Sequence, residues 1–371
     1  MIPVCTPLLG KKEEQYVKDC LRTNWISSSG KYIKLFEEAF SRYCGGKYGV
    51  TTTNGTTALH LTLAALNIGR GDEVIMPTFT IASTAFATIY CGAKPVFVDS
   101  QAGTWNIDAD KIEEKITKRT KAILPVHIYG NPCDMDRIMR LARKYHLSVI
   151  EDAAEAHGAE YKGKKVGGIG DVGCFSFYGN KIITCGEGGM IVTNDKKLAE
   201  RCRSLKNLSF LEKKRFWHEE IGFNYRMTNI QAALGLAQFE HMGDMIERRR
   251  NNARRYNLRF SEVPGLILPV EKEDTKNVYW MYGFLVTKDF GMSRDELMKK
   301  LYKKGIETRT FFWPMHEQPV LKKMGLAGKG RYPVAEAIAR QGLYLPSGSG
   351  LKESEIHYIC DVIQDIQRWG K

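Results

Sequence analysis

The chain has 371 residues, of which 43% are hydrophobic and 26% charged. This composition excludes a disordered or low-complexity protein and predicts roughly two globular domains. The net charge of +13 comes from basic residues spread along the chain, and the densest group, Arg248–Arg250 with Arg254 and Arg255, is predicted to form a solvated helix face rather than a nucleic-acid site.

Cysteine usage and hydropathy narrow the class of protein further. The 9 cysteines are scattered and contain no C-x-x-C pair, which is typical of reduced thiols and not of a disulfide framework or a metal site. No apolar run approaches the roughly 18 residues that span a membrane, and the first residues lack signal-peptide features. We therefore expect a cytoplasmic protein.

The first elements lead to a candidate anion site. Helices are predicted over 11–21 and 33–43, followed by a β-branched strand over 48–53 and a helix over 54–66. Asn54, Gly55 and Thr56 stand where this strand ends and the helix begins. Free N–H groups and the helix dipole favour an anion there, while simple capping of the helix by Asn54 or Thr56 is the alternative.

A regular alternation of strands and helices follows. Strands are predicted over 72–77, 94–99, 121–127 and 147–152, with helices over 81–90, 109–116 and 135–145. Strands separated by helices of this length predict an α/β fold with a mostly parallel sheet covered by helices on both faces. Catalytic groups in such sheets gather at the carboxyl ends of the strands. Residues at or just beyond these ends are 54–56, 77–81, His127, Asp152 and Lys181.

Three ionisable residues come directly after the strand over 147–152. Asp152 ends the strand and precedes two alanines, so it should be buried, and a buried carboxylate needs a cationic partner. That partner is either structural or an aromatic nitrogen that must stay protonated. Glu155 and His157 follow at once, and His157 either orients Asp152 or starts a helix.

The segment 168–173 matches the G-x-G-x-x-G fingerprint of dinucleotide-binding proteins. That fingerprint must follow a strand and open a helix, whereas this copy precedes a strand. We therefore reject a nicotinamide-dependent dehydrogenase.

Lys181 lies in a short polar loop between two apolar strands within 173–192. The glycines at 186, 188 and 189 permit tight or positive-φ turns before the second strand. A surface lysine on a hairpin is one interpretation. The other is a desolvated lysine, whose lowered pKa would let the neutral amine attack an aldehyde.

The remaining chain predicts a smaller unit after the parallel sheet. A helix over 195–207, a charged loop and a long helix over 230–260 lead to Pro264 and Gly265, which break the pattern. Mixed helices and strands follow to the end. The predicted domains are a large cofactor-binding domain, 1–245, and a small C-terminal α+β domain, 246–371.

Six motifs in this order resemble the nucleotide-sugar aminotransferases of the fold-type-I pyridoxal-phosphate enzymes. They are Thr53–Leu59, Met76–Thr80, Ile150–Ala154, Phe175–Phe177 with Lys181, Gly186–Gly189 and Asn224–Met227. The resemblance covers essentially the whole chain and implies an aspartate-aminotransferase-like fold, pyridoxal 5′-phosphate as cofactor and a homodimer with shared active sites.

The resemblance also implies roles for individual residues. Lys181 would bind the cofactor aldehyde and Asp152 would pair with the pyridine nitrogen. The remaining candidates are Gly55, Thr56 and Ser176 with Asn224 of the other subunit at the phosphate, Glu155 at the cofactor, and Trp313 and His316 at the sugar nucleotide. Ile81 departs from the family pattern, because an aromatic residue that stacks on the cofactor usually stands there.

The sequence is most similar to the branch of the family that forms GDP-perosamine for O-antigen polysaccharide. This similarity implies transfer of an amino group from L-glutamate to C4 of GDP-4-keto-6-deoxymannose. A UDP- or dTDP-linked 4-keto-6-deoxyglucose is the alternative substrate. No metal, nucleic-acid or membrane partner is expected.

Overall fold

A computed structural model describes residues 1–211, 213–214 and 216–369. Its central feature is a seven-stranded sheet in the order β1-β9-β8-β5-β4-β2-β3. The strands are β1 (Tyr48–Thr52), β2 (Glu73–Pro77), β3 (Lys94–Val98), β4 (Thr120–Ile123), β5 (Ser148–Asp152), β8 (Val172–Ser176) and β9 (Gly189–Thr193). β9 runs antiparallel to both neighbours, and all other neighbouring pairs are parallel. The predicted mostly parallel α/β sheet is confirmed.

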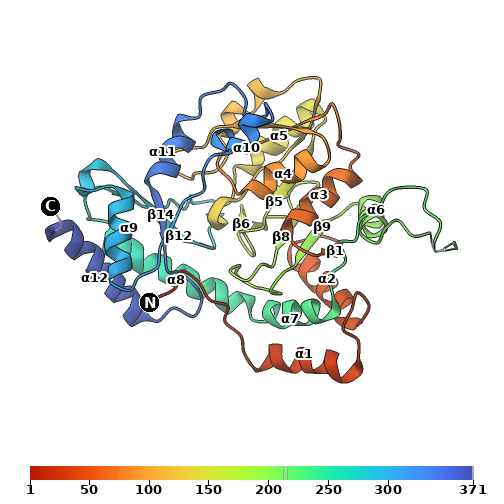
Figure 1. Cartoon of the computed structure of the whole chain (residues 1–371), viewed down its shortest axis with the longest axis horizontal. Coiled ribbons are helices and arrows are strands. Elements are labelled where there is room, and N and C mark those ends of the chain that lie inside the picture. Colours follow the sequence, from red (N-terminus) through yellow and green to blue (C-terminus); the bar gives the residue numbers. More distant parts are fainter. Residues whose placement is uncertain (212, 215, 370–371) are drawn as a thin grey trace.

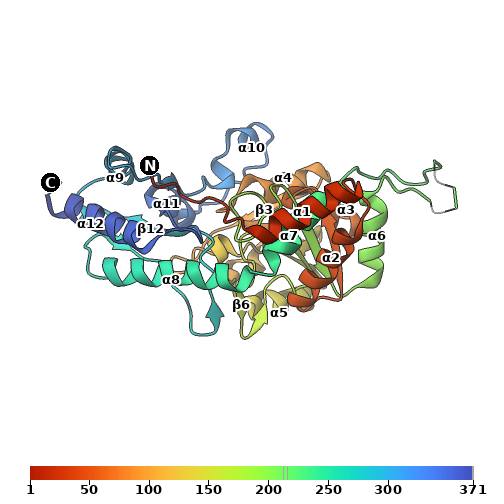
Figure 2. The same cartoon turned by 90° about the horizontal axis from the view of Figure 1, so that it is seen from below.

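Helices cover this sheet, and Figures 1 and 2 show them around it. They are α1 (Lys11–Thr23), α2 (Lys31–Tyr43), α3 (Gly55–Ala65), α4 (Ala82–Tyr90), α5 (Met135–Tyr145), α6 (Lys196–Lys206) and α7 (Asn229–Phe239). α3 packs against α4, α6, β8 and β9, whereas α2 packs against α7 and β1. β2, β8 and β9 are buried along their whole length, as strands covered on both faces must be.

The C-terminal part is built on a four-stranded antiparallel sheet in the order β10-β12-β14-β13. Its strands are β10 (Leu266–Ile267), β12 (Tyr282–Val286), β13 (Arg309–Thr310) and β14 (Gly342–Leu345), and its helices are α8 (Met242–Phe260), α9 (Arg294–Lys303), α10 (Pro319–Lys323), α11 (Pro333–Gln341) and α12 (Glu353–Trp369). A third, three-stranded sheet joins β11 (Thr275–Lys276), β6 (Glu160–Tyr161) and β7 (Lys164–Lys165).

Helix α8 links the two parts, which lie on opposite sides in Figure 2. Its first turns contribute Met245 and Ile246 to the core beneath the large sheet, and its last turns contribute Tyr256 and Phe260 to a second core. The predicted domain boundary between 245 and 246 lies near the start of this helix.

Three predicted elements differ from the structure. Residues 109–116 form two single 3₁₀ turns, Ala109–Lys111 and Glu113–Lys115, because so short a segment is marginal as an α-helix. The strand predicted over 121–127 ends at Ile123. The helix predicted over 230–260 is interrupted where His241 leaves helical geometry, between α7 and α8. Within the described ranges, no helix combines the length and apolarity needed to cross a bilayer.

The prediction of a solvated arginine face on α8 is wrong for Arg249. This side chain is among the largest fully buried ones, at 2% exposure. Its neighbour Arg250 is half-buried and pairs with Glu271. Because α8 crosses from one core to the other, one of its faces is covered along most of its length, and Arg249 lies on that face.

Candidate active site

A cavity of about 430 Å³ opens at the carboxyl ends of the central strands. The predicted residues that line it are Gly55, Thr56, Asp152, Ser176 and Lys181. The other lining residues are Asn54, Leu59, Ile81, Ser83, Ala154, Tyr178, Asn180, Glu187, Trp280, Arg309, Phe312 and Tyr344. Sequence segments more than a hundred residues apart thus meet in one hollow, as the strand-end argument predicts.

The N-terminus of α3 forms one wall of this cavity. Asn54 caps the helix, since its Oδ1 accepts from Thr57 N at 2.9 Å. Gly55 permits a close approach, because a Cβ added there would lie 2.8 Å from the Cβ of Ser176. Thr56 Oγ1 donates to Ser83 Oγ at 3.0 Å. The capping alternative is confirmed, and the first turn also offers a positive dipole end beside the hydroxyl groups of Thr56, Ser83 and Ser176, which suits an anion.

Asp152 lies at the end of β5, at the floor of the cavity. Its Oδ2 accepts from Thr84 Oγ1 at 2.8 Å, and its Oδ1 accepts from Ala154 N at 3.2 Å. Burial raises its pKa, while these hydrogen bonds and the charge of Lys181 act in the opposite direction. The side chain is 3% exposed, and the predicted burial is confirmed.

Lys181 lies in the loop between β8 and β9, and its amine points to an aromatic ring. Its Nζ is 3.6 Å from the centroid of the Trp280 ring. Burial lowers the pKa of Lys181, and the nearby carboxyl groups of Glu155 and Asp152 oppose that shift. Lys181 is therefore not a simple surface lysine: it is a partly buried amine whose proton is weakly held.

The neighbours of Asp152 have separate environments. Glu155 is buried, its Oε2 accepts from Tyr129 N at 2.7 Å, and burial raises its pKa. His157 lies outside any helix and packs among the rings of Phe40, Phe175 and Phe177, so the prediction that it starts a helix is wrong. Burial lowers the pKa of His157 to about 3.

The cavity thus combines a helix N-terminus with hydroxyl groups that suits an anion, a buried carboxylate and an amine whose pKa burial lowers. The sequence profile of the DegT/DnrJ/EryC1/StrS aminotransferase family matches residues 7–364. The chain belongs to this family. It is 46% identical to the GDP-perosamine synthase of Escherichia coli O157:H7 over 98% of both chains. It is 37% identical to dTDP-3-amino-3,4,6-trideoxy-alpha-D-glucose transaminase of Streptomyces venezuelae over 92% of this chain and 89% of that one.

Solved structures agree with this assignment. Streptomyces venezuelae DesV in complex with a ketimine intermediate superposes with a TM-score of 0.91 at 34% identity, covering 98% of this chain and 99% of that one. Aminotransferases of the family use pyridoxal 5′-phosphate, and this is the cofactor of the protein. The residues of the cavity fit it: an anion site for a phosphate, a carboxylate for a protonated ring nitrogen and an amine for an aldehyde.

Ile81, the departure from the aminotransferase pattern, lines the same cavity and is 40% exposed. It precedes α4 as its N-cap residue. An aliphatic side chain therefore occupies the place of the usual stacking aromatic.

Four predicted site residues are not among those that line the cavity: the buried Glu155 described above, Asn224, Trp313 and His316. Asn224 is exposed and forms an isolated antiparallel bridge with Asn207, the residue that ends α6. Trp313 is half-exposed. His316 Nδ1 is 2.7 Å from Thr78 Oγ1.

Sequence reasoning missed Trp280, Arg309 and Tyr344 as cavity residues. They come from the C-terminal sheet and its flanking turns, and no local pattern marks them. His127, by contrast, stands near a strand end but is fully buried and bonded through Nε2 to Glu151 at 3.0 Å.

The rejected glycine fingerprint has a structural role in this aminotransferase. Gly167 N, Ile169 N and Gly170 N all donate to the carboxylate of Glu151, at 2.6–2.8 Å. The loop therefore wraps a buried side chain of its own chain and is not a cofactor site.

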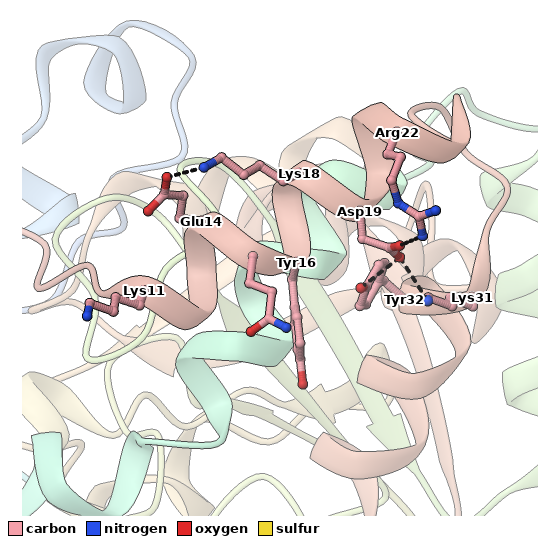
Figure 3. Close-up of a pocket in the computed structure, with 9 residues that line it drawn as sticks. Lys11, Glu14, Tyr16, Lys18, Asp19, Arg22, Lys31 and Tyr32 are labelled. Atoms are coloured by element: carbon pink, nitrogen blue, oxygen red, sulfur yellow. Dashed lines mark hydrogen bonds and ion pairs between the residues drawn. The ribbon is translucent and has the colours of Figure 1, made fainter.

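A larger hollow lies on the surface between α1 and α2, and Figure 3 shows its lining. Most of its charges are paired with one another: Asp19 faces Arg22, Lys31 and the Tyr32 hydroxyl, and Glu14 faces Lys18. The hollow therefore lacks the converging groups of a catalytic site.

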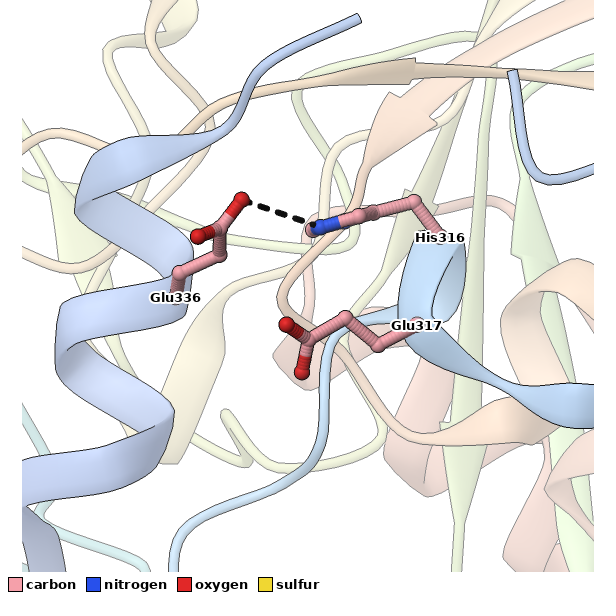
Figure 4. A group of neighbouring side chains, drawn as sticks. All are labelled: His316, Glu317 and Glu336. Atoms are coloured by element: carbon pink, nitrogen blue, oxygen red, sulfur yellow. Dashed lines mark ion pairs between the residues drawn. The ribbon is translucent and has the colours of Figure 1, made fainter. Parts of the chain in front are cut away.

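His316, Glu317 and Glu336 converge in Figure 4 as three groups that could bind a metal ion. Arg340 pairs with Glu317 at 2.7 Å and with Glu336 at 3.3 Å. His316 Nε2 faces Glu336 at 3.4 Å while its Nδ1 contacts Thr78. The cluster already contains its own cation, so it does not indicate a metal centre.

Proposed function

We propose that the protein transfers an amino group from L-glutamate to C4 of GDP-4-keto-6-deoxymannose, forming GDP-perosamine. The observation that carries this proposal is the meeting of Lys181, Asp152 and the N-terminus of α3 in one cavity. The identity of 46% to a GDP-perosamine synthase over nearly the whole chain supports the nucleotide sugar.

The side chains in this cavity have the properties that amino transfer needs. Bound pyridoxal phosphate supplies an electron sink that makes the Cα–H of an amino acid acidic. The carboxylate of Asp152, fixed by Thr84 and Ala154, would hold a proton on the ring nitrogen. The amine of Lys181, once free, would carry a proton to and from the reacting carbon, and burial lowers its pKa, which favours the neutral form that a base needs.

The anion site is assigned to the cofactor phosphate. Gly55 and Thr56 would contribute N–H groups from the first turn of α3. Thr56 and Ser176 would also contribute their hydroxyl groups. We assign Glu155 to the cofactor ring, because it is buried and interacts electrostatically with Lys181.

The chain is proposed to act as a homodimer with shared active sites. Asn224 is exposed beside the end of α6 and would complete the phosphate site of the other subunit. Trp313 and His316, on the loop after β13, are assigned to the sugar nucleotide. The soluble two-domain enzyme, with domains 1–245 and 246–371, would work in the cytoplasm in O-antigen synthesis.

A UDP- or dTDP-linked 4-keto-6-deoxyglucose is the alternative substrate. The chain is 37% identical to a transaminase named for a dTDP-linked sugar and 46% identical to a GDP-perosamine synthase. The sequence similarity therefore supports the GDP sugar more strongly. The chemistry at Lys181 would be the same.

The test is amination of a panel of GDP-, UDP- and dTDP-linked 4-keto-6-deoxy sugars with L-glutamate, followed by mass spectrometry of the products. We expect the highest kcat/KM with GDP-4-keto-6-deoxymannose. A higher value with a UDP or dTDP sugar would replace the substrate, and no amination of any sugar would refute the proposed function.

A further inference from the structure

Trp280 contacts two neighbouring residues of the loop that carries Lys181, Lys181 itself and Asn180. The indole Nε1 of Trp280 donates to the carbonyl oxygen of Asn180 at 2.8 Å, while the ring face lies against Lys181 Nζ at 3.6 Å. One buried ring therefore binds both the amine and the backbone of the residue before it. A cation over an indole face is held electrostatically, so the ring favours the ammonium form at a defined position.

Arg249 binds the backbone of this tryptophan. Its Nη1 donates to the Trp280 carbonyl oxygen at 2.6 Å, its Nε donates to Ser349 Oγ at 3.1 Å and its Nη2 lies 3.3 Å from Cys5 Sγ. Cys5 Sγ in turn lies 3.6 Å from the Asn180 carbonyl oxygen. The guanidinium thus contacts Trp280 directly and is linked to Asn180, the residue before Lys181, through Cys5.

Arg249 is unusual because it is a buried cation without a carboxylate partner among the described residues. Other arginines of α8 have one: Arg250 pairs with Glu271, Arg255 with Glu353 and Arg259 with Asp361. A buried charge without a counter-ion destabilises a fold. Stability alone therefore does not account for an arginine at this position.

The charged groups that act on Lys181 come from two segments, residues 152–155 and α8. Glu155 and Asp152 favour its ammonium form, whereas burial and the positive charge of Arg249 favour the neutral amine. Lys181 and Arg249 also both disfavour protonation of His157. The effects of the two carboxyl groups on the pKa of Lys181 are thus opposed by burial and by one cation, Arg249.

We propose that Trp280 and Arg249 are a positioning pair for Lys181. The indole face positions the amine of Lys181 while that amine is not bound to the cofactor. Arg249 positions the indole and lowers the affinity of the amine for its proton. This inference rests on the proposed function of Lys181 and names two residues that would act through it.

The test measures Lys181 itself in the full-length chain after removal of the cofactor. Limited acetylation at a series of pH values, read by mass spectrometry of the Lys181 peptide, gives the pH midpoint at which the amine becomes reactive. Lys206 is the internal control, because it is a second partly buried lysine, bonded to Glu37 and Thr51.

The neutral variants Arg249→Met and Arg249→Gln remove a positive charge near Lys181, so the Lys181 midpoint should rise by about 1 pH unit. At pH values below the midpoints of wild type and variant, Lys181 should then be labelled about tenfold more slowly in the variant. Arg249→Lys keeps the charge and should stay close to wild type. The Lys206 midpoint should not move. A cooperative thermal transition shows which of the two neutral variants is folded. An unchanged Lys181 midpoint in a folded neutral variant would overturn the role of Arg249.

For Trp280, the expected shift has the opposite sign. Trp280→Leu keeps an apolar side chain but loses the π face that stabilises the ammonium form, so the Lys181 midpoint should fall. Trp280→Phe retains a π face, so its midpoint should stay close to that of wild type. A midpoint that rises or stays constant in Trp280→Leu would overturn the role of the ring.

A separate measurement distinguishes this inference from the proposed function. Wild-type protein with bound cofactor is reduced with borohydride and the modified peptide is identified. A cofactor linked to a residue other than Lys181 would refute the proposed function. A link at Lys181 together with unmoved midpoints would refute the positioning pair alone.

Discussion

Thr84 and Asp152 form a buried hydrogen bond of 2.8 Å that joins α4 to the end of β5. Both residues are buried, so the hydroxyl of Thr84 replaces water as a partner of the carboxylate. Burial raises the pKa of Asp152, and the Thr84 hydrogen bond is the first of the effects that lower it. The protonation of Asp152 therefore depends on a residue of another element.

Replacing Thr84 by valine should move the acid limb of the pH–rate profile. Loss of the hydrogen bond removes one interaction that favours the carboxylate, so the pKa of Asp152 rises and activity is lost at a higher pH than in wild type. One such bond of about 1 kcal/mol corresponds to about 0.7 pH unit. The profile of kcat/KM against pH measures this. Thr84→Ser is the matched control, and an acid limb shared by all three proteins would contradict the expectation.

Asp152→Asn keeps the shape of the side chain and removes its charge. If Asp152 holds the cofactor nitrogen protonated, kcat should fall about 10²-fold or more, the scale of losing one preorganised electrostatic partner. Steady-state kinetics at saturating substrate measure the effect. A loss of less than about tenfold would assign Asp152 a structural role.

His157 should make stability depend on pH in the acid range. Burial lowers its pKa from 6.5 to about 3, so the unfolded chain binds a proton that the folded chain does not between these values. This group has no effect on the free energy of unfolding above pH 6.5, and it lowers that free energy by about 1.4 kcal/mol per pH unit as the pH falls toward 3.

Denaturant unfolding of the cofactor-free chain at several pH values tests this expectation. His157→Leu should unfold with a shallower pH dependence than wild type. His241→Leu replaces an exposed histidine and should retain the wild-type slope. Equal slopes in all three proteins would show that His157 is not buried in its neutral form.

Asn224 tests whether active sites are shared between subunits. Mixing inactive Lys181→Ala with Asn224→Ala under subunit exchange should raise activity above both parents. Each heterodimer would have one site with wild-type Lys181 and wild-type Asn224, and one site with both defects. If mass spectrometry shows exchange and activity stays at the parental average, Asn224 serves its own subunit.

The sequence predicted the parts of the fold that depend on local pattern. Strands followed by turn residues placed Asp152 and Lys181 correctly, because a buried parallel strand has a characteristic apolar run that ends at the sheet edge. The predicted helix over 109–116 was too short to be stable and forms 3₁₀ turns, and the break at His241 has no local signal in the sequence.

The site was predictable only on its large-sheet side. Gly55, Thr56 and Ser176 follow strand ends, but Trp280 and Arg249 come from segments whose partners lie far away in sequence. Arginines in a charged helix normally face solvent. The helical spacing of Met245, Ile246, Ala253 and Tyr256 places position 249 on the apolar face of α8, but what Arg249 contacts there depends on the tertiary arrangement.

The most direct test of the whole account is the absorbance and turnover of Lys181→Ala beside wild type. Wild-type protein with pyridoxal phosphate should show the visible band of a lysine-bound cofactor and aminate GDP-4-keto-6-deoxymannose. Lys181→Ala should lack that band and lose the amination. Turnover at the wild-type level in Lys181→Ala would contradict the central claim that this lysine performs the chemistry.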